Sequence, residues 1–517
     1  MADVCRCEFS KAIAMHARRD LNSVDDLPPS ARGSPLAQTP AQKSALAPGF
    51  VAALHPHPDH VRLLLPGQPE YEERVLQYNA RYADRRPWAI ALCLDEIGVA
   101  RSLEALSACG LPFRLRSAGH SLAGYSSIED GILVHLGELN GIRVDVGQSN
   151  AWIACGATQA QIGTALAPSG LLLPLGDDPV GTGGFAEGGG FGDTSRSYGV
   201  SSDRIVEVKV MLADSRVVYA SDKVNHDLWW AIRGGTGGNF GVLLEARYAL
   251  APAAEQPTFD GSWPLETESD RQNAVTVFTT IQELIDRTDS KFNVFADIRR
   301  YPQTKGGPNV TARLAVDGTY LGKKEELDQL VAPLLAIPGQ GVFNFPDRVL
   351  MSILRKNRFL TRLPPEAWRT VIDDYLDHCN PNSTLTLAAW GGAIDAFPLE
   401  ASAFIHRETY INMYFTGWWD GVSDEQIMRQ YIPRWENSVA PYWNGEVFQN
   451  FADPDLGDYR VRYWGAAFPA LLAVKRKYDP NGFFDFPQAI KPEPHNPHPT
   501  ATWPPKVVQW LSQPIQY

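Results

Sequence analysis

Residues 180–192 read Val-Gly-Thr-Gly-Gly-Phe-Ala-Glu-Gly-Gly-Gly-Phe-Gly, so seven of these residues are glycines. Because glycine has no Cβ, the backbone of such a loop can lie directly on a pyrophosphate or a flat ring and offer it bare N–H groups. No Lys-Ser/Thr pair follows as in a P-loop, and the Rossmann spacing is absent. A flexible linker is the alternative, but the run lies between apolar segments. We therefore expect a cradle for a large ligand.

Short apolar strands alternate with helices on both sides of this run. Asp95 is placed to cap a helix over residues 95–108, and Gly110 is placed to end it. After about Pro252 the helices become longer, which predicts a second lobe of an α+β fold. Further helices are expected at 158–166, 273–288 and 325–335, and strands at 92–94, 113–116, 132–136, 151–155, 205–212, 217–219, 241–248, 292–299, 310–316, 385–390 and 409–415.

The composition is that of a globular chain. At 517 residues it exceeds what one core usually organises, and its apolar and charged fractions of 44% and 21% are ordinary. The net charge of -12 disfavours nucleic acid and anionic membranes as partners. No apolar run approaches about 18 residues, and the N-terminus does not read as a secretory signal. A cytoplasmic location without a membrane partner is therefore expected.

Four further stretches accompany the glycine run in a fixed order. They are Arg-Ser-Ala-Gly-His-Ser-Leu-Ala-Gly-Tyr-Ser-Ser at 116–127, Leu-Trp-Trp-Ala-Ile-Arg-Gly-Gly-Thr-Gly-Gly-Asn-Phe-Gly-Val at 228–242, Asn-Phe-Ala-Asp-Pro-Asp-Leu at 450–456, and the segment 463–483. Together they resemble the berberine-bridge-enzyme-like branch of the vanillyl-alcohol-oxidase superfamily, whose FAD-binding domain is of the PCMH type. The resemblance covers roughly 87–248 and returns near the C-terminus.

This resemblance implies a two-lobed α+β protein: a PCMH-type FAD-binding domain and a substrate lobe built on an antiparallel sheet covered by helices. We expect an N-terminal arm at 1–80, an FAD-binding domain at 81–250 and a substrate-binding domain at 251–445. The chain would return to the FAD-binding domain at 446–495 and end in a tail at 496–517.

The resemblance also implies how FAD is held. In the family the histidine of the first motif bonds to the flavin, so His120 is expected to form the covalent link. Asp177 stands where doubly linked relatives have a cysteine, which leaves a single link, and Phe185 stands where some relatives have a histidine beside the flavin. Val180 matches the residue that oxygen-using relatives tend to have beside the flavin, which favours an oxidase over a dehydrogenase. The residues expected at the cofactor are His120, Arg116, Ser117, Ala118, Gly119, Ser121, Gly124, Asp177, Val180, Gly181, Gly184, Gly188, Gly189, Gly192, Gly241, Val242, Asn450 and Phe451.

The catalytic group is expected on the strand 409–415, where relatives place their base. Alternate residues of a strand share a face, so Tyr410, Asn412 and Tyr414 should project together. Arg407 or His406 would supply the positive charge that helps a tyrosine to lose its proton. Strand aromatics packed in a core are the alternative interpretation for each residue alone. Our catalytic candidates are therefore Tyr410, Asn412, Tyr414 and Arg407.

Two residues depart from the pattern of the sugar-oxidising relatives. Phe448 stands where several of them have a tyrosine base, and Ala467 replaces an asparagine. The expected reaction is hydride transfer from an alcohol-type substrate to the flavin, which O2 reoxidises to give H2O2. Trp390, Trp418 and Trp443 favour an aromatic or natural-product-like substrate. A carbohydrate oxidase and a non-redox flavin-containing cyclase are the alternatives.

No metal site is expected. Cys5 and Cys7 form an isolated C-x-C pair, and the histidines of 55–60 alternate with prolines in what reads as an extended loop. The expected partners are a small-molecule substrate and molecular oxygen.

Overall fold

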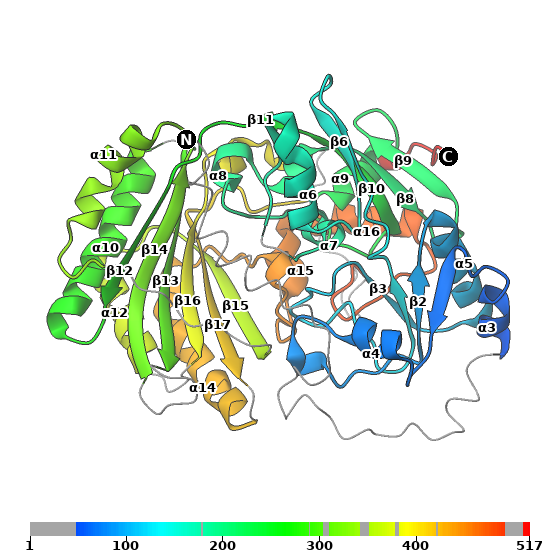
Figure 1. The fold of residues 1–517 in the computed structure, drawn as a ribbon, viewed down its shortest axis with the longest axis horizontal. Coiled ribbons are helices and arrows are strands. Elements are labelled where there is room, and N and C mark those ends of the chain that lie inside the picture. Colours follow the sequence, from blue (N-terminus) through cyan, green and yellow to red (C-terminus); the bar gives the residue numbers. More distant parts are fainter. Residues whose placement is uncertain are drawn as a thin grey trace.

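The computed structural model describes residues 48–176, 179–288, 290–302, 310–341, 351–377, 382–419, 422–491 and 510–517. Its buried apolar side chains form two large cores. One gathers residues from Phe50 to Leu250 with Ala403 and residues 447–490, and the other gathers residues 259–439. Figure 1 shows the corresponding lobes side by side, each built on β-sheet. The chain thus leaves the first lobe and returns to it, and the α+β fold expected from the sequence is confirmed.

The first sheet of the first lobe has four strands in the order β1-β2-β4-β3. Strands β2 (Ala89–Cys93), β4 (Ile132–His135) and β3 (Phe113–Arg116) are parallel, and β1 (Val61–Leu64) pairs with β2 in the antiparallel direction. Helix α5 (Glu96–Cys109) connects β2 to β3. Asp95 accepts a hydrogen bond from the Gly98 N–H at 2.9 Å, and Gly110 adopts φ +61°. Both predicted helix ends are confirmed.

The predicted N-terminal arm is wrong over the part of it that the structure describes. Residues 48–82 form α3 (Pro48–Leu54), β1, α4 (Pro69–Val75) and the 3-10 helix η2 (Ala80–Tyr82). A high proline content does not make this segment extended, because Pro48 and Pro69 open its two α-helices, where the missing N–H costs nothing. Phe50, Leu54 and Tyr71 are buried, so the segment belongs to the first lobe.

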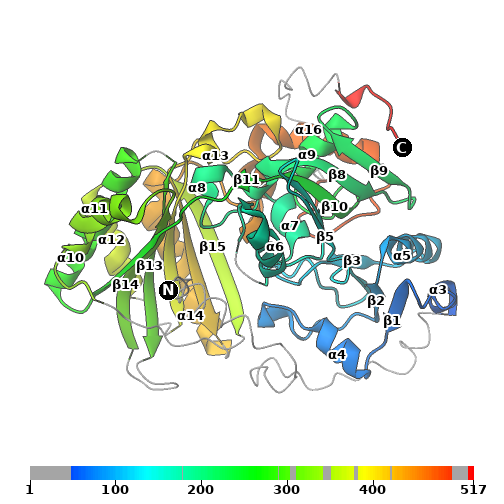
Figure 2. The same ribbon diagram turned by 45° about the horizontal axis from the view of Figure 1, so that its top comes forward.

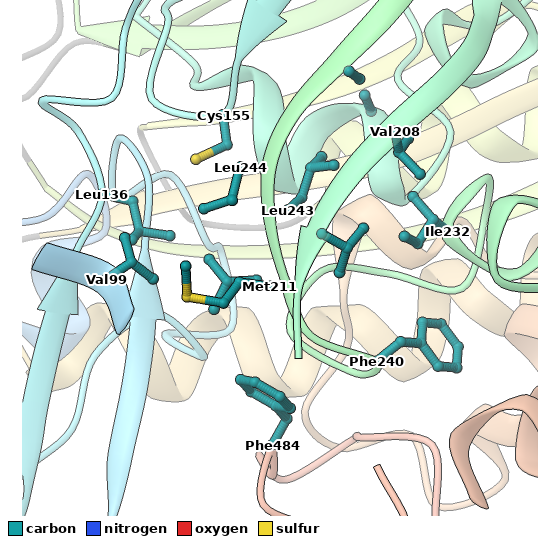
Figure 3. Packing of buried hydrophobic residues seen from close by; sticks show 14 of the residues in the cluster. Val99, Leu136, Cys155, Val208, Met211, Ile232, Phe240, Leu243, Leu244 and Phe484 are labelled. Atoms are coloured by element: carbon teal, nitrogen blue, oxygen red, sulfur yellow. The ribbon is translucent and has the colours of Figure 1, made fainter. Parts of the chain in front are cut away.

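The second sheet of this lobe is antiparallel, in the order β5-β6-β10-β8-β9. Its strands are β5 (Ile142–Asp145), β6 (Asn150–Ala154), β10 (Val242–Ala249), β8 (Ile205–Met211) and β9 (Val217–Ser221). Figure 3 shows the packing between the sheets, where Val99 and Leu136 approach Met211, and Cys155 lies beside Leu244. Helices α6 (Gln159–Leu166), α7 (Thr182–Glu187), α8 (Ser195–Tyr198) and α9 (His226–Ile232) belong to the connections, and the glycine run contains α7.

The second lobe is one antiparallel sheet in the order β12-β14-β13-β16-β17-β15. Helices α10, α11, α12 and α14 lie on the side away from the first lobe, while β15 forms the edge nearest to it (Figures 1 and 2). The sequence missed β12, β15, α12 and α14. The strands are β12 (Thr258–Pro264), β13 (Phe292–Pro302), β14 (Val310–Tyr320), β15 (Ser352–Leu360), β16 (Ser383–Ala389) and β17 (Ile411–Trp419), and the helices are α10 (Glu268–Arg287), α11 (Lys324–Leu335), α12 (Pro365–Leu376) and α14 (Val422–Val439).

The returning segment closes the first lobe with α15 (Tyr459–Trp464) and α16 (Phe468–Tyr478). The Lys475 ammonium of α16 donates to the Asn239 carbonyl at 2.7 Å and to Asp479 at 2.5 Å. These bonds anchor α16 on residues 228–242, the second glycine-rich stretch of the chain. Among the described residues, no helix has the length and apolar character needed to cross a membrane.

Candidate functional site

One face of the six-stranded sheet is polar although it is turned toward the first lobe. Strand pairing places Asn357, Tyr414, Thr386 and Asp297 in one row across β15, β17, β16 and β13. The alternate residues, such as Met413 and Leu385, belong to the apolar core beneath the helices. The polar face carries Arg355, Asn357, Asn412, Tyr414, Thr416, Thr384, Thr386, Asp297, Arg299 and Asp317. We call this set the sheet face.

Tyr414 and Arg355 of the sheet face both contact the first lobe. Its ring lies 5.0 Å from the ring of Phe451, measured between centroids, and the Arg355 guanidinium lies 4.9 Å from the Tyr414 centroid. Arg355 is also 4.5 Å from the Phe451 centroid and donates from Nε to Thr416 Oγ1 at 2.9 Å. A guanidinium held against the ring favours a tyrosine that has given up its proton.

Asn450, the residue before Phe451, connects this contact with the glycine run. Its Nδ2 donates to the Phe185 carbonyl at 2.8 Å, and a Cβ added to Gly188 would overlap its Oδ1. A Cβ on Gly192 would likewise overlap the Leu175 carbonyl. At Gly184, by contrast, a Cβ would meet no protein atom within 4 Å, and this residue is exposed. The run therefore packs tightly on one side and presents bare backbone on the other.

His120 lies in the loop after β3. Its ring stacks on Tyr78 with centroids 4.5 Å apart, and the Tyr78 N–H donates to the Gly119 carbonyl at 3.2 Å. Burial lowers the pKa of His120 to about 4, although the side chain keeps partial exposure. The imidazole is therefore neutral near pH 7, which is its nucleophilic form.

The loop of His120 and the glycine run are in contact. A Cβ on Gly181 would overlap Ser117 Oγ and lie 2.9 Å from the Ala118 nitrogen. Ser117 Oγ in turn donates to the Cys155 carbonyl at 2.7 Å. The structure thus brings two of the predicted cofactor motifs together, with bare main chain on both. Gly119 and Gly124 have positive φ, and the Ser121 hydroxyl accepts from the Tyr125 N–H.

Several predicted cofactor residues turn out to shape the loops. The buried Arg116 guanidinium donates to the carbonyls of Arg74, Val75, Leu76 and Ser126, so its donors hold the loop in place. A Cβ on Gly241 would press on the Met211 carbonyl at 2.6 Å, and Val242 is buried in β10. The Val180 carbonyl accepts from the Gln159 N–H. Asp177 lies outside the described residues.

The residues fit a flavin dinucleotide. The cradle offers bare backbone and neutral His120, and the sheet face supplies unmet polar atoms. Asn357 donates to Asn412 at 3.3 Å, which leaves buried Asn357 Oδ1 and Asn412 Nδ2 without a partner in the described part of the chain. A ring system with both hydrogen-bond donors and acceptors satisfies such a pair.

Comparison with known families decides the identity. A model of the FAD binding domain matches residues 87–221, and the model described as berberine and berberine like matches residues 447–491. The chain is an FAD-linked oxidoreductase that carries an FAD binding domain and a berberine-like C-terminal segment, and it is similar to the berberine-bridge-enzyme-like proteins. FAD is therefore its cofactor.

Its berberine-bridge-enzyme-like relatives match most of its length. The FAD-linked oxidoreductase YvdP of Bacillus subtilis is 29% identical over 453 residues, covering 83% of this chain and 98% of YvdP. Tetrahydroberberine oxidase of Berberis wilsoniae is 26% identical over 469 residues, covering 79% and 86% of the two chains. The fold is shared with a chitooligosaccharide oxidase at a TM-score of 0.74 and 22% identity, covering 87% of this chain and all of that one.

The structure places the catalytic candidates in different parts of the protein. Asn412 and Tyr414 share the sheet face as predicted. The prediction that Tyr410 joins them is wrong, because β17 begins at Ile411 and the Tyr410 hydroxyl donates to the Gln282 carbonyl at 2.9 Å and to Asp286 at 2.8 Å, both on α10. Burial raises the pKa of Tyr410 to about 12.

The charges expected to assist Tyr414 also lie elsewhere. Arg407 is buried and pairs with Asp203 at 2.6 Å and 2.8 Å, with further donors directed at the Ile394 carbonyl and Ser402. His406 is bound through both ring nitrogens, to Glu446 and Gln449, at 2.7 Å each. The structure places Arg355 at Tyr414 instead. We therefore assign Arg407 to joining the two lobes.

Sequence reasoning missed Arg355, Asn357, Asp297, Arg299 and Asp317. Asp297 pairs with Arg299 through one carboxylate oxygen, and the other is buried without a partner among the described residues. The pKa of Asp317 is raised to about 8, chiefly by burial and then by the Asp297 carboxylate, while the Arg299 guanidinium acts to lower it. The available signal was alternation, because Asp297 and Arg299 are two residues apart in the predicted strand 292–299. Asp317 lies one residue beyond the predicted strand 310–316, in the part of β14 that the prediction left out.

Proposed function

We propose that this protein is an FAD-dependent oxidase that removes a hydride from a hydroxyl-bearing carbon of a polar small molecule. The observation that carries the proposal is the chain of contacts from Tyr414 through Phe451 and Asn450 to the glycine run. It sets a proton acceptor of the sheet face beside the cofactor cradle. When bound, FAD supplies the hydride acceptor and passes the electrons to O2, giving H2O2.

Tyr414 is the proposed base. It takes the proton of the substrate hydroxyl while the adjacent C–H loses its hydride. Arg355, 4.9 Å from the ring centroid, stabilises the tyrosinate that this requires. Phe451 packs against both side chains and keeps water from that side of the pair. Asn412, two residues before Tyr414 on the same face, is proposed to orient the substrate or the flavin through its unmet Nδ2.

The sheet face favours a hydroxyl-rich substrate over an aromatic one. Trp390 is fully buried, stacks on Phe191 at 4.4 Å and donates to the His406 carbonyl, so its ring is already covered. The Trp443 ring carries two guanidinium groups, of Arg358 at 4.8 Å and of Arg462 at 4.5 Å. These placements give no support to stacking of a substrate on either tryptophan.

Trp418 does lie on the sheet face, four residues after Tyr414 on β17, but the face otherwise carries hydroxyls, carboxyls, two amides and two guanidinium groups. Thr386 and Asp297 continue the row of Tyr414 across the next two strands, about 5 Å and about 10 Å away at the usual strand spacing. Acceptors and donors side by side match a molecule with several hydroxyl groups. We therefore place carbohydrate-type substrates first, a class that the name of the chitooligosaccharide oxidase supports. Natural-product alcohols come second, and here the name of tetrahydroberberine oxidase supports a natural product only.

We further propose that His120 alone links FAD covalently. The neutral imidazole and the contact of its loop with the glycine run support this. The proposed function is tested by mixing the protein anaerobically with oligosaccharides and with benzylic or alkaloid alcohols while flavin absorbance is followed. Bleaching by a sugar, with peroxide formed when air is admitted, is the expected result. A substrate that is converted without any bleaching would indicate the non-redox cyclase instead.

A further inference from the structure

Glu187 is a buried acid in the glycine run that the proposed chemistry does not use. It is the last residue of α7 and is 6% exposed. Among the described residues its carboxyl makes no hydrogen bond and no ion pair. A buried carboxyl without a partner is costly, so its surroundings identify what it serves.

The carboxyl lies where the two glycine-rich stretches meet. A Cβ on Gly237 would lie 2.9 Å from Glu187 Oε2 and 3.6 Å from the Gly184 Cα. The backbone carbonyl of Glu187 accepts from the N–H groups of Gly234 and Thr236, both at 3.0 Å. The stretch around Gly184 is the one that offers bare, exposed backbone.

The turn opposite Glu187 is strained. Thr236 has φ +68°, which is unfavourable for a β-branched residue, and Thr236, Gly237 and Gly238 all keep partial exposure. Strained backbone of this kind concentrates where a ligand is bound. Open glycines and a strained turn thus surround a carboxyl that lacks a partner.

The titratable groups that face Glu187 do not neutralise it. They are the Cys155 thiol and the Tyr248 hydroxyl of β10, and burial raises the pKa of both well above the usual range. Tyr248 has no hydrogen-bond partner among the described residues, and Figure 3 shows Cys155 beside the apolar Leu244. Burial raises the pKa of Glu187 itself to about 8, so near pH 7 it is a neutral acid.

We propose that Glu187 is a direct contact of the FAD diphosphate, to which its carboxyl donates a hydrogen bond. Phosphate oxygens only accept hydrogen bonds, and a carboxylate at this place would repel them. A protonated acid satisfies both groups at once. The glycines around Glu187 allow the dinucleotide to lie close to the backbone, and this would bring its diphosphate within reach of the Glu187 carboxyl.

The test uses the His120→Ala background, in which FAD is held without a covalent bond and its binding can be titrated by quenching of flavin fluorescence. Glu187→Leu is expected to weaken FAD binding by about tenfold to about a hundredfold at pH 7, the loss of one hydrogen bond to a charged group. Glu187→Gln, which keeps a donor, should bind nearly as wild type. Glu207→Gln, on β8 and paired with Arg247, is the control that should change nothing.

The pH dependence separates a donor from an acceptor. As pH rises above about 8 the parent protein must take up a proton to bind FAD, so its affinity should fall toward tenfold per pH unit, and Glu187→Gln should lose this dependence. An unchanged affinity in Glu187→Leu overturns the proposal. So does a Glu187→Gln variant that binds poorly while the parent does not weaken above pH 8, because that result makes the carboxylate an acceptor.

A second measurement covers the case in which the His120→Ala protein does not fold. In the intact holoenzyme, the phosphorus NMR signals of the FAD diphosphate should shift in Glu187→Leu relative to wild type. They should stay in place in Glu207→Gln. Diphosphate signals that are identical in wild type and Glu187→Leu contradict the contact.

Discussion

The cradle and the sheet face are two halves of one site, but they are built from opposite materials. The cradle is main chain: Gly188 and Gly192 leave no room for a Cβ, and Gly184 leaves its backbone bare. The sheet face is made of side chains, such as Arg355, Tyr414 and Asp297, that come from separate strands. The residues of the cofactor half are therefore consecutive in sequence, whereas those of the substrate half come together only through strand pairing.

Because the two halves are built differently, substitutions in each should change a different property of the protein. A change in the cradle should affect cofactor loading and stability, while a change on the sheet face should affect turnover with the flavin still in place. A change at a residue that only joins the two halves should lower the stability of the fold before it affects turnover or cofactor loading.

Tyr414→Phe gives the largest expected effect on the sheet face. Loss of a general base lowers the rate of flavin reduction by about a hundredfold to ten-thousandfold, while flavin content stays unchanged. Stopped-flow reduction under anaerobic conditions measures this. The matched control is Tyr410→Phe, whose hydroxyl is directed at α10, and its rate should stay within about twofold of wild type. Equal losses in both variants would remove Tyr414 from its role.

Asp203→Asn tests the residues that join the halves. It leaves the buried Arg407 guanidinium without its charge partner, so the free energy of unfolding should fall by about 3–5 kcal/mol. Urea denaturation followed by tryptophan fluorescence measures this. The exposed pair of Arg434 and Asp374 offers the comparison, since Asp374→Asn should cost less than about 1 kcal/mol. If Asp203→Asn instead folded normally and lost only turnover, Arg407 would belong to the catalytic machinery.

Gly188→Ala tests the cradle. The added methyl group overlaps Asn450, so overpacking should cost about 1–3 kcal/mol and reduce the FAD bound per chain. The ratio of flavin to protein absorbance reports the loading. Gly163→Ala in α6 meets only a Leu175 methyl group at 3.8 Å and should load fully. Full loading of both variants would mean that the run is not the cradle.

Asp317→Asn gives the smallest expected effect. Because the pKa of Asp317 in the folded protein is raised to about 8, the folded state holds its proton more tightly than the unfolded state does. Stability is therefore lost as pH rises, and the loss is complete above about 8. Between pH 6 and pH 9 the melting temperature of wild type should fall about 2–4 °C more than that of Asp317→Asn. A fall of the same size in both proteins would mean that Asp317 does not titrate there.

The sequence predicted the cradle better than it predicted the sheet face. The glycine run, the capped helix α5 and most first-lobe strands were predicted, because their signals are local. Strand β15 reads Ser-Ile-Leu-Arg-Lys-Asn-Arg-Phe-Leu, and its four consecutive polar residues, 355–358, are largely buried in the structure, whereas such a polar run in a sequence suggests exposure to solvent. Arg355 and Asn357 were missed with it. Tyr410 was misplaced because the alternation was extended one residue beyond the start of β17.

We expect one covalent bond between FAD and the chain, at His120, and mass spectrometry of the protein detects such a bond. The intact denatured chain should be heavier by one FAD less two hydrogens, and the flavin should map to the peptide that contains His120. His120→Ala should lose this mass. A chain of unmodified mass, or a flavin mapped to another residue, would contradict the account.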